Sequence, residues 1–180
     1  SEQADRWNTG SVDSYSEWRS ERRTQFFEQL YTNVIVGKTI LEVGCGAGHL
    51  MEKIQSVNPN ATMYGVDISS TMVDHCRERG FHNVQVGSGN ALEYPNEMFD
   101  SVFVGTWVMK YLDRDKALSE MHRVLKPGGV IAFDLPFVWG HGFCTLLRNK
   151  LSLPKNAYLK LDGRFYPNWK HILRKKGFKV

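Results

Sequence analysis

The chain has 180 residues, of which 42% are apolar and 23% are charged. This length suits one domain with a real hydrophobic core, and this composition excludes an intrinsically disordered protein. No stretch is apolar for about 18 residues or more, which argues against a transmembrane helix. No charged-then-apolar segment resembling a secretion signal stands at the amino end. We therefore expect a single-domain globular protein in the cytoplasm.

The formal net charge of +4 is unevenly distributed along the chain. Residues 1–147 hold 13 Lys/Arg and 18 Asp/Glu, whereas residues 148–180 hold 10 Lys/Arg and one acid, Asp162. A basic carboxyl region of this kind indicates either a solvated helix or a surface for anionic substrates, nucleic acid or anionic lipid. Composition alone leaves both interpretations open.

The three cysteines, Cys45, Cys76 and Cys144, are far apart and odd in number. No Cys-x-x-Cys pair or histidine-rich cluster accompanies them, so no metal site is expected. We interpret them as reduced thiols of a cytoplasmic protein.

Secondary-structure signals alternate along the chain. Residues 1–37 form a polar lead-in that becomes helical toward its end. Strands are then expected at residues 39–43, 62–66, 84–86, 99–104 and 130–135, and helices at residues 49–57, 69–79 and 113–125. Alternating strands and helices imply right-handed crossovers and a mostly parallel sheet with helices on both faces, which binds ligands at the carboxyl ends of its strands.

The pattern changes after residue 135. Residues 137–156 mix large apolar residues with glycines and bases, and we interpret them as a substrate lid that, as a helix, would be amphipathic and able to touch a membrane surface. Residues 168–176 read as a late helix. A sixth strand would begin at Gly177 and be cut off at Val180, which suggests a truncated chain with lowered stability and homo-oligomer formation through the uncovered edge.

A glycine-rich turn follows the first strand. Gly44, Gly46 and Gly48 are spaced as G-x-G-x-G, which differs from the G-x-G-x-x-G of dinucleotide-binding folds and lacks the Gly-Lys-Ser/Thr of a P-loop. Asp67 ends the second strand, where a carboxylate can accept hydrogen bonds from the two hydroxyls of a ribose or can cap the next helix. The combination favours a nucleoside-containing ligand.

These segments resemble the class I S-adenosylmethionine-dependent methyltransferases, in the broad group that includes ubiquinone/menaquinone-type and other small-molecule enzymes. The matching motifs are residues 41–48, residues 64–69 with Met72, residues 89–91, residues 99–102 and residues 120–129. The resemblance is strong over about residues 39–136 and looser elsewhere. It implies a Rossmann-like class I methyltransferase fold, apparently without the last strands at the carboxyl end, and S-adenosyl-L-methionine as the cofactor.

The resemblance also implies roles for individual residues. Backbone at Gly44, Cys45 and Gly46 would approach the methionine part, Glu42 would bind its ammonium group, and Asp67 would hold the ribose. The adenine would lie between Ile68 and Met72, with the Asn90 side chain accepting from its amino group and the Ala91 amide donating to its ring. The family more often has Asp at position 90. Gly105, Thr106 and Trp107 would border the methyl group, and Tyr15 and Arg19 would close over the cofactor.

No catalytic base stands out. Residues 108–111 replace a stretch where relatives often carry a Glu-His or His-His pair, so a borrowed catalytic histidine is in doubt. His141, Tyr111 and Asp134 are candidates, each with the alternative of a polar residue at a pocket rim. In this scheme residues 1–180 form one methyltransferase domain, with a helical lid at 1–37, a cofactor-binding core at 38–136, and a substrate lid and late helix at 137–180.

Three functions compete on sequence grounds. A small-molecule methyltransferase acting on an apolar or anionic acceptor is favoured. An RNA methyltransferase would use the basic carboxyl region, but no Asn-Pro-Pro-Tyr-type motif follows the fourth strand, so nucleic acid is not the expected partner. A domain that binds S-adenosylmethionine without transferring the methyl group is the third hypothesis.

Overall fold

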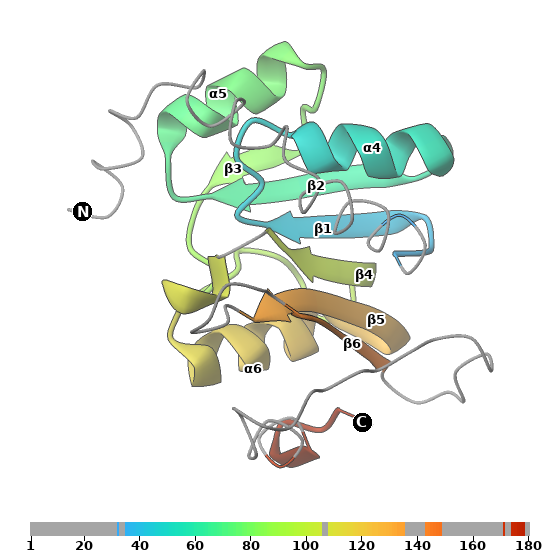
Figure 1. The fold of residues 1–180 in the computed structure, drawn as a ribbon, viewed down its shortest axis with the longest axis vertical. Coiled ribbons are helices and arrows are strands. Elements are labelled where there is room, and N and C mark those ends of the chain that lie inside the picture. The colour runs from blue at the N-terminus through green and yellow to red at the C-terminus, as the bar shows by residue number, and fades with distance from the viewer. Residues whose placement is uncertain are drawn as a thin grey trace.

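The computed structural model describes residues 32, 35–105, 108–135, 143–148, 171 and 174–178. Within them the elements follow in the order β1 (Thr39–Val43), α4 (His49–Val57), β2 (Thr62–Asp67), α5 (Ser70–Glu78), β3 (Val84–Val86), β4 (Phe99–Val104), the short 3-10 helix η1 (Val108–Lys110), α6 (Arg114–Val124), β5 (Leu125–Leu135) and β6 (Phe143–Arg148). Figure 1 shows α4 and α5 beside the β2 and β3 half of the sheet and α6 beside β5.

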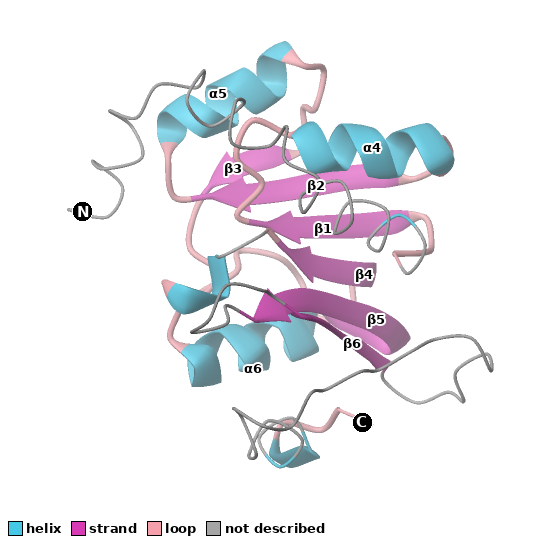
Figure 2. Ribbon diagram, in the orientation of Figure 1, coloured by secondary structure: helices cyan, strands magenta, loops and turns pink. Residues whose placement is uncertain are grey.

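The described strands form one sheet in the order β3-β2-β1-β4-β5-β6. The first five strands of this order are parallel, and β6 runs antiparallel to β5. The arrowheads of the parallel strands in Figure 2 point the same way, so the loops that follow β1, β2 and β4 gather at one edge. The predicted α/β class with a mostly parallel sheet is confirmed.

Side chains alternate between two buried layers. Ile40 of β1 and Phe103 of β4 belong to a layer with α4 and α5, whereas Leu41 and Val102 belong to a layer with α6. Each of these four side chains is fully buried. Strands covered on both faces read as continuous apolar runs, which is why the sequence pattern identified them.

Two helices begin at side chains that cap them. The Ser69 hydroxyl accepts a hydrogen bond from the Met72 amide at the start of α5, and the Asp113 carboxylate accepts from the amides of Asp115 and Lys116 at the start of α6. Helix α4 instead begins after Gly48, whose left-handed φ of 80° ends the glycine turn, and it has no side-chain cap. Such caps satisfy backbone donors that have no partner within the helix.

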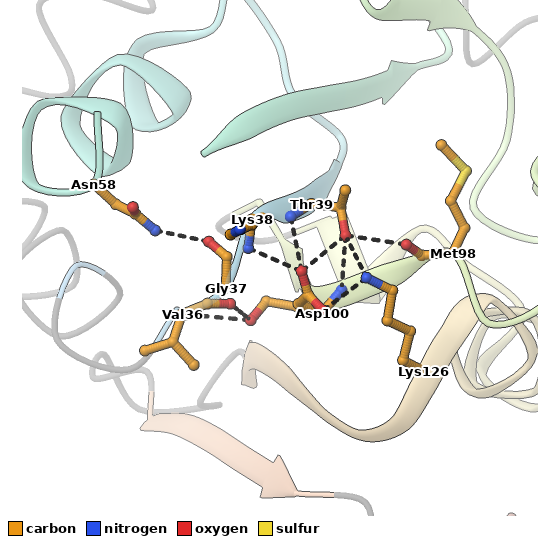
Figure 3. Close-up of polar contacts among 9 residues, drawn as sticks. Val36, Gly37, Lys38, Thr39, Asn58, Met98, Asp100 and Lys126 are labelled. Carbon is orange, nitrogen blue, oxygen red and sulfur yellow. Dashed lines mark hydrogen bonds and ion pairs between the residues drawn. The ribbon is translucent and has the colours of Figure 1, made fainter. Parts of the chain in front are cut away.

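A hydrogen-bond network around Asp100 lies at the other end of the parallel strands, where β1 begins (Figure 3). Asp100 Oδ2 accepts from the backbone amides of Lys38 and Thr39 at 2.8 and 2.9 Å, and Oδ1 accepts from Lys126 Nζ at 2.8 Å. Burial alone would raise the pKa of Asp100, but the hydrogen bonds from Lys126, Thr39 and Lys38 outweigh it and hold the pKa at about 2. The network joins the start of β1 to β4 and β5.

Two expectations about the carboxyl-terminal part, a helix over residues 143–148 and a sixth strand that begins at Gly177, are wrong, whereas the role of residues 137–156 as a substrate lid stays a prediction. Residues 143–148, within the segment interpreted as an amphipathic lid, form strand β6, because β5 offers an open edge with which their backbone pairs from Leu135 to Val130. The sixth strand therefore lies here and does not begin at Gly177. Phe178 is 3% exposed and packs edge-on against His122 of α6, with ring centroids 4.9 Å apart.

Other differences are smaller. Strand β5 begins at Leu125 rather than at Val130, and its pairing with β4 shifts register between Phe99 and Ser101. Residues 171, 174 and 175 of the expected late helix are helical. The lid at 1–37 lies largely outside the described residues. No helix within the described ranges is long and apolar enough to cross a membrane.

Candidate functional site

The candidate site lies where β1, β2 and β4 end. Val43 pairs with both Val66 and Val104, so the three following loops start side by side. The Gly44 amide donates to Val66 O at 2.7 Å, and the Gly105 amide donates to Val43 O at 2.8 Å. These bonds continue the sheet's hydrogen bonding into the loops and hold the edge together.

Glycines are required at this edge for conformation and for space. Gly44, Gly46 and Gly48 have φ of 75°, 51° and 80°, in the left-handed region that glycine enters at little cost. A Cβ at Gly105 would lie 2.4 Å from Gly44 O, and one at Gly44 would lie 2.4 Å from Val108 Cγ2. The loops after β1 and β4 therefore lie in close contact, and side chains larger than hydrogen do not fit at Gly44 and Gly105.

Asp67 joins two of these loops. Its Oδ2 accepts from the Gly46 amide at 2.8 Å and its Oδ1 accepts from the Ser69 amide at 3.0 Å. Burial raises the pKa of Asp67, and the backbone N–H groups that donate to it partly offset this rise. The N-cap of α5 is Ser69, so the helix-cap alternative for Asp67 is wrong. Each carboxylate oxygen of Asp67 keeps a further lone pair beside its backbone bond, so ribose binding stays a prediction that these bonds allow.

Glu42 is a buried acid one residue before the end of β1. It is 2% exposed and stands in register with Gly65 of β2 and Phe103 of β4. An ionised carboxylate in such a position needs polar or charged partners. The ammonium of a bound amino acid would be one suitable partner.

Ile68 and Met72 lie beyond Asp67, at the start of α5. Ile68 is half-buried and Met72 is buried. The position of Met72 is fixed by the bond from its amide to the Ser69 hydroxyl. Both residues are apolar and follow Asp67 closely in the chain, and their contact with adenine stays a prediction.

The loop after β3 carries the clearest sign of a missing partner. Asn90 Oδ1 is buried and has no hydrogen-bond partner among the described residues. Its backbone belongs to a turn in which the Asn90 amide donates to Ser88 Oγ and the Ala91 amide donates to Ser88 O at 3.1 Å. The loop lies close to the glycine turn, because a Cβ at Gly89 would be 2.6 Å from Val43 Cγ1. A buried acceptor without a donor costs free energy, and an exocyclic amino group would satisfy it.

The Ala91 amide is a more complex case. Since it already donates within the turn, a ring nitrogen of a ligand would have to share or replace that bond. The sequence offered no indication of this competition.

Several predicted site residues lie outside the described residues: Tyr15, Arg19, Thr106, Trp107 and His141. Tyr111 is 36% exposed just after η1, with Lys110 Nζ 4.6 Å from the centre of its ring. Asp134 lies in β5, with its backbone in register with Cys144 of β6. The role of Tyr111, Asp134 and His141 as bases stays a prediction.

Cys45 and Cys76 are free and buried. The side-chain contact with Cys76, together with burial, raises the pKa of the Cys45 thiol. A protonated, buried thiol is a poor nucleophile, so we assign Cys45 only a backbone role. Within the described ranges no group of three or more His, Cys, Asp or Glu side chains could hold a metal ion.

The sequence did not identify two features of the site region. Val108 of η1 packs so closely against Gly44 that any larger residue at position 44 would overlap its side chain. Glu120 and Arg123 of α6 reach across to the backbone of Leu92, in the loop after β3. Their spacing of three residues on a helix was a visible signal of an ion pair, but nothing in the sequence indicated which backbone groups it would hold.

Comparison with known proteins agrees with this geometry. A family described as "Methyltransferase domain" matches residues 41–133, just over half of the chain and the whole of the edge described above. The chain belongs to this family, within the class I S-adenosylmethionine-dependent methyltransferases. S-adenosylmethionine is the cofactor of this class, and the buried acceptor of Asn90, the Asp67 carboxylate and the left-handed glycine turn fit it.

Individual relatives extend the comparison. The demethylmenaquinone methyltransferase of Geobacillus stearothermophilus is 38% identical over 105 residues, which cover 54% of this chain and 45% of that protein. A crystal structure of an S-adenosylmethionine-dependent methyltransferase from Thermotoga maritima has 25% identity and a TM-score of 0.57, covering 69% of this chain and 57% of that one. The [4+2]-cyclase SpnF has 27% identity and a TM-score of 0.53, over 62% and 44% of the two chains. The chain spans about half the length of the curated relatives it matches.

Proposed function

We propose that the chain binds S-adenosylmethionine at the carboxyl edge of β1, β2 and β4 and transfers its methyl group to a small-molecule acceptor. The observation that carries the proposal is the buried Asn90 Oδ1 beside the glycine turn, which has no hydrogen-bond partner within the part of the chain that the structure describes. An acceptor in that position matches the amino group of adenine, and Asp67 stands one strand away with lone pairs for ribose hydroxyls.

Each part of the cofactor has a matching group on the chain. Glu42 offers a buried carboxylate for the ammonium, Gly44 and Gly46 offer close backbone approach, and Ile68 and Met72 offer apolar walls. S-adenosylmethionine supplies a methyl group that its sulfonium already activates for in-line displacement. The chain then has to align the acceptor with that methyl group and exclude water.

A quinone-type ring is the acceptor that we favour. The supporting fact is the likeness to demethylmenaquinone methyltransferases over residues that include the site. Such an acceptor is apolar and carries an activated ring carbon, so a strong general base is not essential. A reaction without a strong base agrees with residues 108–111, which hold no Glu-His or His-His pair. In such a reaction Tyr111 and His141 would be polar residues at the rim of the pocket. A lipophilic quinone would also bring the protein to a membrane surface.

The RNA alternative has less support. Lys176, a member of the basic carboxyl region, forms an ion pair with Asp115 at 3.4 Å and a hydrogen bond to Ser119 Oγ at 2.9 Å. At least this part of the basic charge serves contacts within the fold. We also propose a cytoplasmic location, which the free cysteines Cys45 and Cys76 support.

A second candidate is a domain that binds the cofactor without methyl transfer. The similarity to SpnF, a [4+2]-cyclase, favours keeping this candidate. The two candidates differ in one product, since only a methyltransferase releases S-adenosylhomocysteine.

The test uses the purified chain. Titration calorimetry with S-adenosylhomocysteine measures binding, and incubation with S-adenosylmethionine and a short-chain demethylmenaquinone measures transfer by mass spectrometry. We expect binding and a product heavier by one methylene unit. Absence of binding would overturn the cofactor assignment, whereas binding without turnover on any quinone would favour the second candidate.

A further inference from the structure

Helix α6 reaches the loop after β3 through one ion pair. Glu120 and Arg123 lie three residues apart, with Arg123 Nη2 2.7 Å from Glu120 Oε2. Both side chains are partly buried, at 23% and 32% exposure. The two side chains form hydrogen bonds with backbone groups of Leu92 and Tyr94, which lie about 30 residues earlier in the chain.

Every N–H donor of the Arg123 guanidinium is used in a hydrogen bond. Arg123 makes five hydrogen bonds: two to the Glu120 carboxylate, and one each to Leu92 O at 2.7 Å, Tyr94 O at 2.7 Å and Asn96 Oδ1 at 3.0 Å. A guanidinium has five N–H donors, so none is left over. Glu120 Oε2 also accepts from the Leu92 amide at 2.8 Å. Leu92 therefore has both of its backbone polar groups held by α6.

Hydrogen bonds therefore hold the turn that carries Asn90 at both of its ends. On one side the Gly87 amide donates to Asp67 O at 2.8 Å, and on the other side Leu92 is held by Glu120 and Arg123. Between these points lie Ser88 to Ala91, closed by the bond from the Ala91 amide to Ser88 O. A short turn with fixed ends has little freedom to reorient its side chains.

We propose that Glu120 and Arg123 are a positioning pair that presets the Asn90 turn for the adenine of the cofactor. The inference rests on the proposed function. The pair acts through backbone and has no contact of its own with the cofactor. Ordering a loop when a ligand binds weakens the affinity, so a loop that is ordered beforehand binds more tightly.

The pKa shifts of Glu120 and Arg123 both favour the charged forms that make the ion pair. The hydrogen bond from Arg123 lowers the pKa of Glu120, and the same bond raises the pKa of Arg123. Bidentate geometry of this kind depends on the planar fork of arginine, which a lysine cannot reproduce. This difference provides a substitution that keeps the charge and removes the fork.

The test measures the affinity for S-adenosylhomocysteine by titration calorimetry in four proteins: the unchanged chain, R123K, N90A and the double variant. We expect R123K to weaken binding about fivefold to tenfold, roughly what one hydrogen bond is worth. In the N90A background the same change should have less than a twofold effect, because the group that Arg123 positions is gone. E120Q, which keeps one carbonyl oxygen, should fall between R123K and the unchanged chain.

The matched control is R77K. Arg77 of α5 also pairs with an acid three residues earlier, Asp74, and also donates to a backbone carbonyl, Val84 O at 3.1 Å, but this lies at the start of β3 and away from the turn. R77K should leave the affinity within twofold of the unchanged chain. Thermal unfolding of every variant, measured without ligand, identifies the folded fraction used in each titration.

Three outcomes would count against the proposal. Equal losses from R123K with and without Asn90 would mean that Arg123 supports the fold only. An unchanged affinity of folded R123K would overturn the positioning role directly. If the unchanged chain fails to bind S-adenosylhomocysteine, the proposed function falls and the inference falls with it, a result that the other two outcomes cannot imitate.

Discussion

At the scale of single residues, the Asp67 carboxylate combines an observed role in holding two loops with a proposed role in binding ribose. It accepts backbone bonds from Gly46 and Ser69, which hold two loops in place, and it retains lone pairs for a ligand. The sequence suggested ribose binding or a cap of the next helix, and the cap is provided by Ser69 instead. The bonds from Gly46 and Ser69 hold the carboxylate where β1 and β2 end, and its remaining lone pairs are the ones that we propose for ribose hydroxyls.

Asp67→Ala is therefore expected to affect both functions. We expect the affinity for S-adenosylhomocysteine to fall by about 1–3 kcal/mol, as lost charged hydrogen bonds would cause, together with a lower unfolding midpoint. Calorimetry and thermal unfolding measure the two effects separately. Asp74→Ala is the control, because Asp74 lies exposed on α5 and pairs with Arg77. An affinity equal to that of the control would contradict the ribose assignment.

A second residue-scale prediction concerns Gly105. The added methyl group of Gly105→Ala would meet Gly44 O at 2.4 Å, a backbone atom that cannot move without separating the loops after β1 and β4. We expect a loss of stability of about 1–3 kcal/mol and weaker cofactor binding.

Gly80→Ala is the matched comparison for Gly105→Ala. Gly80 has a φ of 91°, but a Cβ there would meet nothing within 4 Å. This variant should lose about 1 kcal/mol of stability from backbone strain and keep its affinity. Denaturant titration and calorimetry on both variants distinguish crowding at the site from strain elsewhere. Equal affinities in the two variants would refute the assigned role of Gly105.

At the scale of elements, Asp100 connects the start of β1 with β4 and β5 (Figure 3). Its pKa of about 2 lies below the ordinary value of 3.8, so the folded state favours the charged form. The stabilisation is complete above about pH 4 and is lost as the pH falls through 2. The difference corresponds to about 2 kcal/mol of free energy of unfolding.

Asp100→Asn isolates this contribution. Urea unfolding should show the variant less stable than the unchanged chain by about 2 kcal/mol at pH 6, and the gap should narrow progressively between about pH 4 and pH 2.5. A gap that stayed constant over this range would mean that the charge of Asp100 is not what stabilises the network. Gly37, whose φ is 104°, brings the chain within contact of Asp100 and is part of the same arrangement.

At the scale of the whole molecule, the sequence predicted the bounds of those helices and strands that have turn-forming residues at both ends. Helix α4 and strands β3 and β4 have the predicted bounds, because glycine, proline and asparagine punctuate the apolar runs around them. The glycine turn and Asp67 were also predicted together, since both follow strands that end at one edge. These signals are local in sequence and need no knowledge of the fold.

The features that the sequence did not predict depend on contacts between segments that are distant in the chain. Strand β6 forms because β5 leaves an edge open, and the mixed sequence of residues 143–148 gives no sign of it. Arg123 binds carbonyl groups of Leu92 and Tyr94, and backbone carbonyls carry no residue-specific signature. Lys126 and Asp100 were each recognised in separate motifs, but their contact became visible only when β4 and β5 lay side by side.

The bonds that join the loops at the carboxyl edge have a kinetic consequence. Gly44 to Val66, Gly46 to Asp67 and Gly105 to Val43 are all formed within the chain itself. These three loops are already joined before the cofactor binds, so the association step itself should not require them to rearrange. In a stopped-flow experiment that follows tryptophan fluorescence, the observed rate should rise linearly with S-adenosylhomocysteine concentration. A plateau would instead mean that a slower reorganisation of the chain sets the rate of association.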